Sequence, residues 1–307
     1  MIDWLRLVRL PNLATAAADS LAGFLICWSA TGQSGWPPVA CWLAVAASVA
    51  FYAAGVVLND VCDVDIDRRE RPERPLPRGA IAVPAAAAVG RGLLGAGSAA
   101  ACCSAVAAGS AWPAAVGAAL TAAVWLYDRH AKATPAGPVV MGCCRGLNWL
   151  LGMTAAGGPS ALHEWAIPIG MAIYVAGITL YARDEAGRSR AVVLVAGTVA
   201  MGLGLAVAAA QVWLPWRGGS PAGVAGFPAD NWLLLWGVLG TSVLYRALQG
   251  VVDPTSGRVR AAVGNAIMSM ITLDAVLVLP SAGPRWAVAL LGLLALFLVG
   301  RRLVPPT

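Results

Sequence analysis

The amino-acid sequence predicts an all-α polytopic membrane protein, built as one bundle of nine or ten transmembrane helices. Of the 307 residues, 59% are hydrophobic and only 12% are charged, about half the charged fraction of an average soluble chain. Apolar stretches of about 20 residues, long enough to cross a hydrocarbon core as a helix, recur along the whole chain. They lack the polar alternation of barrel strands, so helices are favoured. An ordinary soluble domain is excluded.

Glycine, proline and charged clusters separate ten candidate spans within a single domain, residues 1–307. In chain order the spans cover residues 12 to 32, 39 to 59, 83 to 107, 112 to 128, 137 to 156, 164 to 182, 190 to 214, 230 to 249, 261 to 279 and 284 to 302. No long-period repeat, soluble domain or low-complexity linker interrupts them, and abundant alanine and glycine suit close helix packing.

The net charge of +6 is explained by membrane topology, so no nucleic-acid partner is predicted. With the N-terminus in the cytoplasm, nearly all basic residues fall on the inner side: Arg6, Arg9, the cluster from Arg68 to Arg78, Arg129, Lys132, the cluster from Arg183 to Arg190, the cluster from Arg246 to Arg260, Arg301 and Arg302. Only Arg217 and Arg285 fall outside. We therefore expect an integral membrane protein of the lipid bilayer that forms a bacterial inner (cytoplasmic) membrane, with its N-terminus in the cytoplasm.

A dense acidic segment directly follows the second apolar stretch, Asn59-Asp60-Val61-Cys62-Asp63-Val64-Asp65-Ile66-Asp67. Continued as a helix, it places Asn59, Asp63 and Asp67 on one face beside Asp60. Carboxylates this close repel one another unless a cation compensates them, and Mg²⁺ takes hard oxygen ligands together with substrate phosphates. The segment predicts a Mg²⁺ site with Asp60, Asp63 and Asp67 as ligands. A solvated helix end paired with neighbouring arginines is the alternative.

The segment resembles the first signature of the UbiA superfamily of intramembrane prenyltransferases, Asn-Asp-x-x-Asp-x-x-x-Asp, which is matched at all four positions. Downstream Arg68 and Arg74-Pro75-Leu76-Pro77-x-Gly79 resemble the family's cytosolic loop, and Arg9-Leu10-Pro11-Asn12 resembles its first span. The resemblance implies that Asp63 and Asp67 are catalytic and that Mg²⁺ binds with the diphosphate of an isoprenyl donor. It also implies donor contacts from four residues: Asn59, Asp60, Arg68 and Arg74. The likeness covers most of the first 190 residues in order, and the family usually has nine spans.

A second Asp-rich motif of the family is only partly matched, by Tyr181, Arg183 and Asp184 within residues 181–190. Gly187 and Ala191 stand where later aspartates are expected. The resemblance implies catalytic roles for Tyr181 and Asp184, with Asp184 also a metal ligand. It implies that the diphosphate is bound by arginines of this segment: Arg183 and Arg188. Alternatively the second site is degenerate.

Polar residues inside the apolar spans are candidates for contacts with an acceptor, because they are expensive in lipid. They are Asp19, Arg145 with Asn148, and Asp274; Lys132, in the inner loop at residues 127 to 132, is a candidate phosphate contact. A buried pair of Arg145 with Asp19 or Asp274 is an equally compatible, purely structural interpretation. We expect Asp274 to be a structural or pore-lining residue.

The resemblance as a whole implies Mg²⁺-dependent transfer of an isoprenyl group from its diphosphate to a hydrophobic or aromatic acceptor. The reaction would take place in a central apolar chamber that opens toward the cytoplasmic side. The segments at Tyr181 and Arg145 resemble the EboC-like branch. Two alternatives stay open: a non-catalytic isoprenoid-binding member of the family, and a membrane transporter or scaffold.

Overall fold

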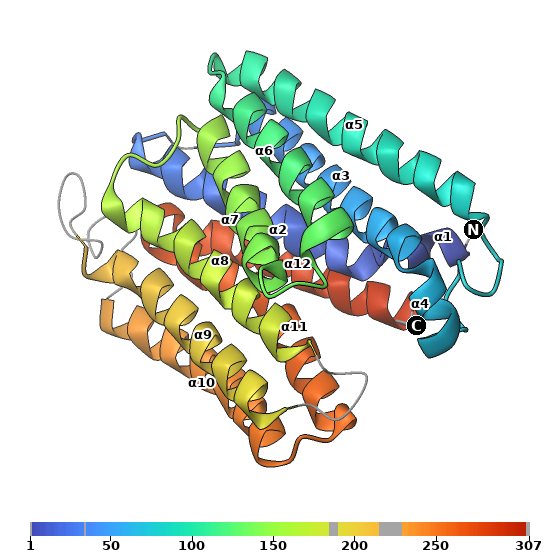
Figure 1. Ribbon diagram of the computed structural model, residues 1–307. Coiled ribbons are helices and arrows are strands. Elements are labelled where there is room, and N and C mark those ends of the chain that lie inside the picture. The colour runs from blue at the N-terminus through green and yellow to red at the C-terminus, as the bar shows by residue number, and fades with distance from the viewer. Residues whose placement is uncertain (1, 34, 184–189, 215–228, 305–307) are drawn as a thin grey trace.

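The computed structural model describes residues 2–33, 35–183, 190–214 and 229–304, and this described part is helical without any strand (Figure 1). In chain order its elements are α1 (Ile2–Leu7), α2 (Leu10–Ala30), α3 (Val39–Cys62), α4 (Val64–Glu70), α5 (Val83–Ala108), α6 (Trp112–Leu126), the π-helical turn η1 (Tyr127–Ala131), α7 (Gly137–Ala155), α8 (Leu162–Tyr181), α9 (Ala191–Ala209), the 3₁₀ turn η2 (Ala210–Val212), α10 (Ala229–Val252), α11 (Ser256–Ala282) and α12 (Pro284–Leu303).

A long helix lies at each of the ten predicted spans, with ends that differ by a few residues. The largest differences are in α11, which begins at Ser256 rather than at residue 261, and in α9, which ends at Ala209 rather than at residue 214. Within the described ranges, seven helices are long and apolar enough to cross a membrane: α2, α3, α5, α8, α9 with η2, α11 and α12. The all-α membrane fold is therefore confirmed, and the number of crossings stays a prediction.

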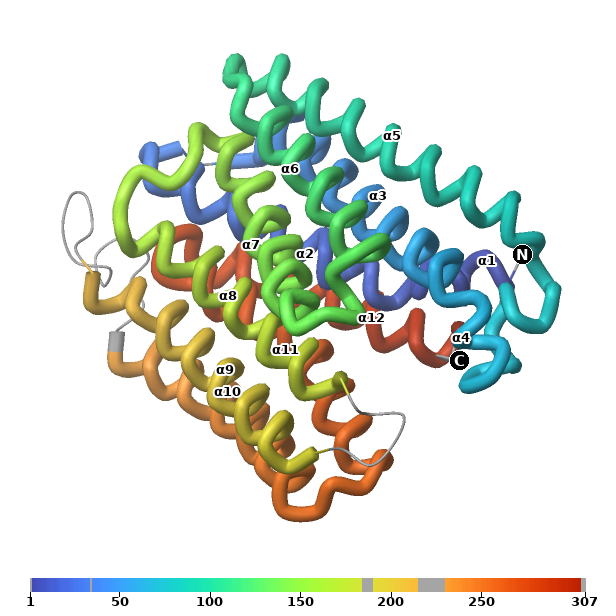
Figure 2. Tube along the Cα trace, in the orientation of Figure 1, coloured from blue at the N-terminus to red at the C-terminus, as the bar shows by residue number. Residues whose placement is uncertain are grey.

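Helix α2 lies in the middle of the bundle, where it contacts α3, α7, α11 and α12. Further out, α5 covers α3 and α9 covers α8 (Figures 1 and 2). The beginning of α2 and the end of α12 are neighbours, because a Cβ added to Gly300 would lie 3.3 Å from the Cα of Pro11. This contact brings the start of α2 and the end of α12 together on one side of the bundle.

Glycines let the central helices approach one another closely, as small residues do in membrane bundles. Gly152 of α7 faces the backbone of α2, and a Cβ at this position would overlap the carbonyl oxygen of Ser20. The outer pair α8 and α9 is fitted together in the same way at Gly177 and Gly197. At these glycines the helices are in backbone contact.

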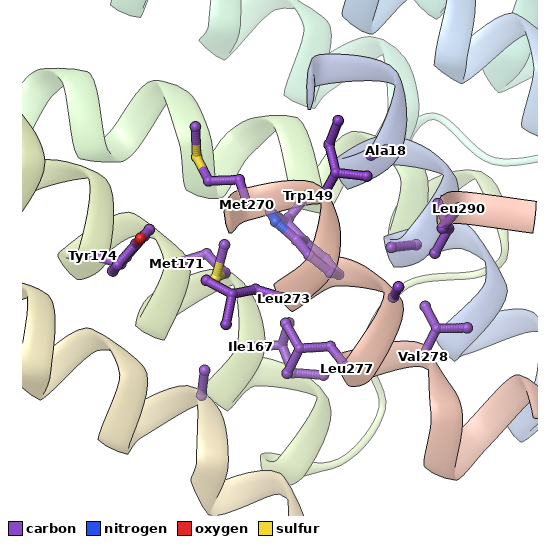
Figure 3. Close-up of a cluster of buried hydrophobic side chains, with 14 of the residues drawn as sticks. Ala18, Trp149, Ile167, Met171, Tyr174, Met270, Leu273, Leu277, Val278 and Leu290 are labelled. Atoms are coloured by element: carbon purple, nitrogen blue, oxygen red, sulfur yellow. The ribbon is translucent and has the colours of Figure 1, made fainter. Parts of the chain in front are cut away.

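The centre of the bundle is filled by large apolar side chains from α7, α8 and α11 (Figure 3). Trp149, Met171 and Leu273 are fully buried there, and the Tyr174 hydroxyl donates a hydrogen bond to the carbonyl oxygen of Ala266 at 2.9 Å. The hydroxyl bond satisfies a polar group that would be costly to leave unpaired. The part of the core drawn in Figure 3 is filled by side chains and does not contain the predicted central chamber. The chamber therefore stays a prediction.

The acidic segment forms two helices rather than one continuous helix. Helix α3 ends at Cys62, Asp63 has a non-helical conformation with φ −94° and ψ 1°, and α4 begins at Val64. Backbone bonds still join residues four apart on both sides of the break: Asp63 N–H donates to Asn59 O at 3.0 Å, and Asp67 N–H donates to Asp63 O at 2.8 Å. The predicted spacing of the acidic side chains therefore survives the break.

Candidate active site

Arg74 connects two carboxylates of the acidic segment. It lies in the loop after α4, and its Nη1 donates to Asp67 Oδ2 at 2.7 Å while lying 3.6 Å from Asp60 Oδ1. All three side chains are buried. Charge-assisted hydrogen bonds of this kind are shorter and stronger than neutral ones. Asp60 and Asp67 are thereby held together by one guanidinium, as expected for members of a single site.

Arg9 approaches the same site from the junction of α1 and α2. Its Nη2 donates to Asp60 Oδ1 at 3.1 Å, although 51 residues separate the two in sequence. The Arg9 backbone is left-handed, with φ 48° and ψ 54°, and no other non-glycine residue in the described part of the chain has a positive φ. This conformation costs a residue with a side chain about 1–2 kcal/mol. The strained turn coincides with a residue that contacts the Asp-rich segment.

The turn η1 adds a second acidic group and a lysine. The Nδ2 of Asn59 donates to Asp128 Oδ1 at 3.2 Å, and Lys132 forms an ion pair with Asp63. Burial raises the pKa of Asp128 to about 6, while the Asn59 hydrogen bond acts in the opposite direction. The other oxygen of this carboxyl group, Oδ2, is buried without a hydrogen-bond partner. Asp128 is therefore ready to accept a cation or a proton donor.

We refer to these side chains together as the Asp cluster. Its members are Asn59, Asp60, Asp63, Asp67 and Asp128, with the cations Arg9, Arg74 and Lys132. Four carboxylates thus face three cations, and three of the carboxylates pair with protein cations. Such a set can bind a metal on its carboxylates and a polyanion on its guanidinium and ammonium groups.

Other predicted site residues lie differently. Arg68 is exposed and pairs with Asp65 at 2.7 Å, which directs it away from the buried carboxylates. The Tyr181 hydroxyl donates to the carbonyl oxygen of Ala247 in α10 at 2.8 Å. Arg183 is exposed, and its Nη2 donates to the carbonyl oxygen of Ala133 at 3.3 Å, next to the η1 turn. Asp184 and Arg188, which were also predicted for the site, lie outside the described residues.

Asp19, Arg145, Asn148 and Asp274 form a buried polar cluster between α2, α7 and α11. Arg145 Nε lies 2.6 Å from Asp19 Oδ2, and Asn148 Nδ2 donates to the same oxygen at 3.0 Å. The Asp274 carboxyl adjoins that of Asp19, and neither Asp274 oxygen meets a donor among the described residues. The structure therefore shows the buried pair of Arg145 with Asp19. Both are engaged within the protein.

The donor set of the Asp cluster suits Mg²⁺ shared with phosphate oxygens better than a closed protein cage. Within the described ranges, no three His, Cys, Asp or Glu side chains are grouped closely enough to hold a metal ion by themselves. Mg²⁺ usually needs only one or two carboxylates, because waters and substrate phosphates complete its shell. The oxygen donors here, including the unpartnered Asp128 Oδ2, fit that requirement.

Arg9 and Asp128 were not among the residues predicted for the site. Both lie at the polar ends of apolar stretches, where charged residues are usually lipid-facing anchors. The only signal was indirect, since Arg9 belongs to a segment that resembles the family's first span and Asp128 precedes Lys132 in the inner loop. Their partners, 51 and 69 residues away, become apparent only in the fold.

Comparisons with known proteins identify relatives of this chain. A digeranylgeranylglyceryl phosphate synthase of Metallosphaera sedula is 35% identical over 99 residues, which are 32% of this chain and 33% of that protein. The chain thus spans about a third of the length of this curated relative.

Two solved structures share the fold. One, described as digeranylgeranylglyceryl phosphate synthase in membranes, has a TM-score of 0.63 at 18% identity and covers 91% of this chain and 98% of its own. The other is a UbiA homolog from Archaeoglobus fulgidus bound to DMAPP and Mg²⁺, with a TM-score of 0.55 at 15% identity and 98% coverage of both chains. The family model for UbiA prenyltransferases matches residues 20–269. With most of its length matched, this chain belongs to the UbiA prenyltransferase family.

Proposed function

We propose that this protein is an intramembrane prenyltransferase that uses Mg²⁺ to transfer an isoprenyl group from its diphosphate to a hydrophobic or aromatic acceptor. The observation that carries the proposal is the pairing in the Asp cluster, where Arg74 and Lys132 each hold an aspartate of the Asn59–Asp67 segment. These cations neutralise carboxylates that would otherwise repel one another at short range. The same cations are the groups a diphosphate would need.

Donor binding would exchange these partners. Mg²⁺, when bound to the carboxylates, supplies positive charge to the leaving diphosphate. Arg9, Arg74 and Lys132 are then free to turn from carboxylate to phosphate oxygens, which guanidinium groups bind in a two-pronged geometry. Asn59 holds Asp128 in place at 3.2 Å. These groups stabilise the charge that develops on the diphosphate as the bond to the isoprenyl carbon breaks.

In the proposed reaction the apolar interior of the bundle protects the isoprenyl carbon from water. Breaking the carbon–oxygen bond of an allylic diphosphate leaves carbocation character on the isoprenyl carbon, and water would capture it. Packed apolar side chains from α7, α8 and α11 (Figure 3) exclude water deeper in the bundle. The Asp cluster lies at the ends of α3 and α6, and in the proposal the diphosphate binds there while its tail enters the bundle.

Asp19, Arg145 and Asn148 are best explained as the structural joint of α2 and α7. Their polar atoms bond to one another and to the α2 backbone, as in the 3.1 Å bond from Asn148 Nδ2 to the carbonyl oxygen of Ala16. An acceptor would have to break these bonds in a buried setting. The proposal therefore places acceptor selection elsewhere and keeps Asp184 as the candidate ligand from the second motif.

The same arrangement supports a proposal for the orientation in the membrane. The Asp cluster lies at the end of the bundle that holds the start of α2, the end of α3 and the turn η1. Cytoplasmic diphosphates would reach it if this end faces the cytoplasm, as the arginine distribution favours. We propose a cytoplasmic N-terminus in a cytoplasmic membrane.

The test is a transfer assay with the full chain in lipid nanodiscs. Dimethylallyl, geranyl, farnesyl and geranylgeranyl diphosphates are each combined with aromatic acids, lipid alcohols and glyceryl phosphate lipids, with Mg²⁺ or with EDTA. The proposal expects diphosphate release together with a prenyl mass shift in one acceptor, only with Mg²⁺. Mg²⁺-dependent binding without release under every combination would favour a non-catalytic member. Neither binding nor release would favour a transporter or scaffold.

A further inference from the structure

A pocket of about 270 Å³ opens between α10, α11 and α12, and its lining residues are distinct from the Asp cluster. Three arginines, one from each helix, line it: Arg246, Arg260 and Arg301. Guanidinium groups are weakly hydrated planar forks that match phosphate oxygens. Three of them around one hollow concentrate positive charge from segments that are far apart in sequence.

The three guanidinium groups have no carboxylate partner among the described residues. Arg260 Nε donates only to the carbonyl oxygen of Ser256, at 3.3 Å, and Arg301 lies over the ring of Phe297 at 5.9 Å. Asp253, in the turn between α10 and α11, is paired with Arg258 at 3.1 Å, which does not line the pocket. The positive charge of the pocket is therefore not neutralised within the described part of the protein.

The floor of the pocket is formed by α11 and offers one more donor. A Cβ added to Gly264 would meet nothing within 4 Å, so the helix surface is open there. Asn265, the next residue of α11, also lines the pocket, and its Nδ2 is buried without a hydrogen-bond partner. An unpaired buried amide donor is costly. A ligand oxygen seated over Gly264 would satisfy it.

The pocket lies at the same end of the bundle as the Asp cluster. Gly300, next to Arg301, packs against Pro11 at the start of α2. Ala247, next to Arg246, accepts the hydrogen bond of Tyr181 at the end of α8. Met268 continues the lining toward the apolar middle of α11. The pocket thus has arginines near the helix ends and an apolar lining toward the middle of the bundle. This combination suits a phosphate group attached to a hydrocarbon tail.

We propose that this pocket binds the phosphate ester group of a membrane amphiphile. Arg246, Arg260 and Arg301 bind the phosphate oxygens, the Asn265 amide donates to one of them, and the tail extends along α11 beside Met268. Such a ligand exists in two forms, a phospholipid of the surrounding leaflet and a phosphorylated lipid that arrives as a reactant. The inference is independent of the proposed transferase activity, because it needs no turnover.

The test is native mass spectrometry of the full chain in detergent, titrated with dioleoyl phosphatidic acid, with dioleoylglycerol, which lacks the phosphate, and with inorganic phosphate. We expect phosphatidic acid to bind far more tightly than the other two. Arg301→Gln removes a pocket charge, whereas Arg302→Gln removes its neighbour, which does not line the pocket. The first should weaken phosphatidic acid binding about tenfold, as expected for one charge-assisted bond, and the second by less than about twofold.

A third variant separates the pocket from general surface charge. Gly264→Leu fills the open floor and leaves every charge in place, and circular dichroism checks that its helix content is unchanged. It should abolish phosphatidic acid binding. Equal losses in Arg301→Gln and Arg302→Gln, equal binding of dioleoylglycerol, or preference for inorganic phosphate would each overturn the proposal. Adding an isoprenyl diphosphate with Mg²⁺ separates the two sources of the ligand. A bound lipid of unchanged mass behaves as a leaflet lipid, whereas a prenyl mass shift in a bound glyceryl phosphate lipid indicates a reactant.

Discussion

Replacing Arg145 by methionine removes the only cation of the buried polar cluster, and we expect a large loss of stability. Arg145 Nε lies 2.6 Å from Asp19 Oδ2, with Asp19 fully buried and the Arg145 side chain 7% exposed. Asp274 adjoins Asp19 and is also fully buried. Without the guanidinium, two carboxyl groups remain in the interior with Asn148 as the remaining donor to Asp19.

The magnitude follows from the burial. Breaking a buried ion pair by removing one partner costs about 3–5 kcal/mol, because the remaining charge is uncompensated. Asp19→Asn should cost less, about 1.5–3 kcal/mol, because Arg145 keeps its contact with Thr15 and Asp274 remains nearby. The double variant should be no less stable than Arg145→Met alone, which corresponds to a coupling energy of about 1.5–3 kcal/mol.

The assay is reversible unfolding in mixed detergent micelles, followed by far-ultraviolet circular dichroism as the fraction of sodium dodecyl sulfate rises. Arg258→Met is the control, because it breaks an exposed ion pair with Asp253 and should change the free energy of unfolding by less than about 1 kcal/mol. An Arg145→Met variant that unfolds within about 0.5 kcal/mol of the wild type would refute the reasoning. Strict additivity of the two single variants would do the same.

Three further changes test other parts of the fold and site. Gly152→Ala inserts a methyl group against the backbone of α2 and should lower the free energy of unfolding by about 1–3 kcal/mol in the same assay. Its control is Gly92→Ala, whose methyl group meets no neighbour within 4 Å and should change the free energy of unfolding by less than about 0.5 kcal/mol. Equal effects of the two variants would contradict the close approach of α7 and α2. Lys132→Gln should raise the KM for the isoprenyl diphosphate about tenfold, and an unchanged KM would remove Lys132 from the donor site. Arg9→Gly removes the strain of a left-handed backbone, about 1–2 kcal/mol, and also removes the contact with Asp60. The affinity for the isoprenyl diphosphate should therefore fall while the free energy of unfolding does not. A parallel fall of the affinity and of the free energy of unfolding would show that Arg9 is purely structural.

The helices were predictable because apolar length and the ends marked by glycine, proline and charge determine them locally. The break at Asp63 was not predictable in this way, since the acidic spacing suits an uninterrupted helix equally well. The direction of Arg68 depends on its local pairing with Asp65, which competes with the buried carboxylates. In each case the outcome depends on neighbours that sequence periodicity does not specify.

The Asp-rich segment was predictable because four carboxylates after an apolar stretch have few structural explanations. Arg9 and Asp128 were not, because their partners come from other helices and because charged residues at membrane ends are common. For Arg145 and Asp19 the sequence offered two interpretations of equal merit. The 2.6 Å ion pair favours the structural one, and a contact of these residues with an acceptor stays a prediction.

The central claim is that the Asp cluster performs isoprenyl transfer, and one matched pair of variants tests it most directly. Asp67→Asn changes a buried carboxylate held by Arg74 at 2.7 Å, whereas Asp65→Asn makes the same change at an exposed residue two positions away. The measurement is the rate of Mg²⁺-dependent prenyl product formation in nanodiscs, read by mass. We predict a fall on the order of 100-fold for Asp67→Asn, equivalent to about 3 kcal/mol of transition-state stabilisation, and a rate within about twofold of wild type for Asp65→Asn. Equal rates for the two variants, or a wild-type rate unaffected by EDTA, would contradict the account.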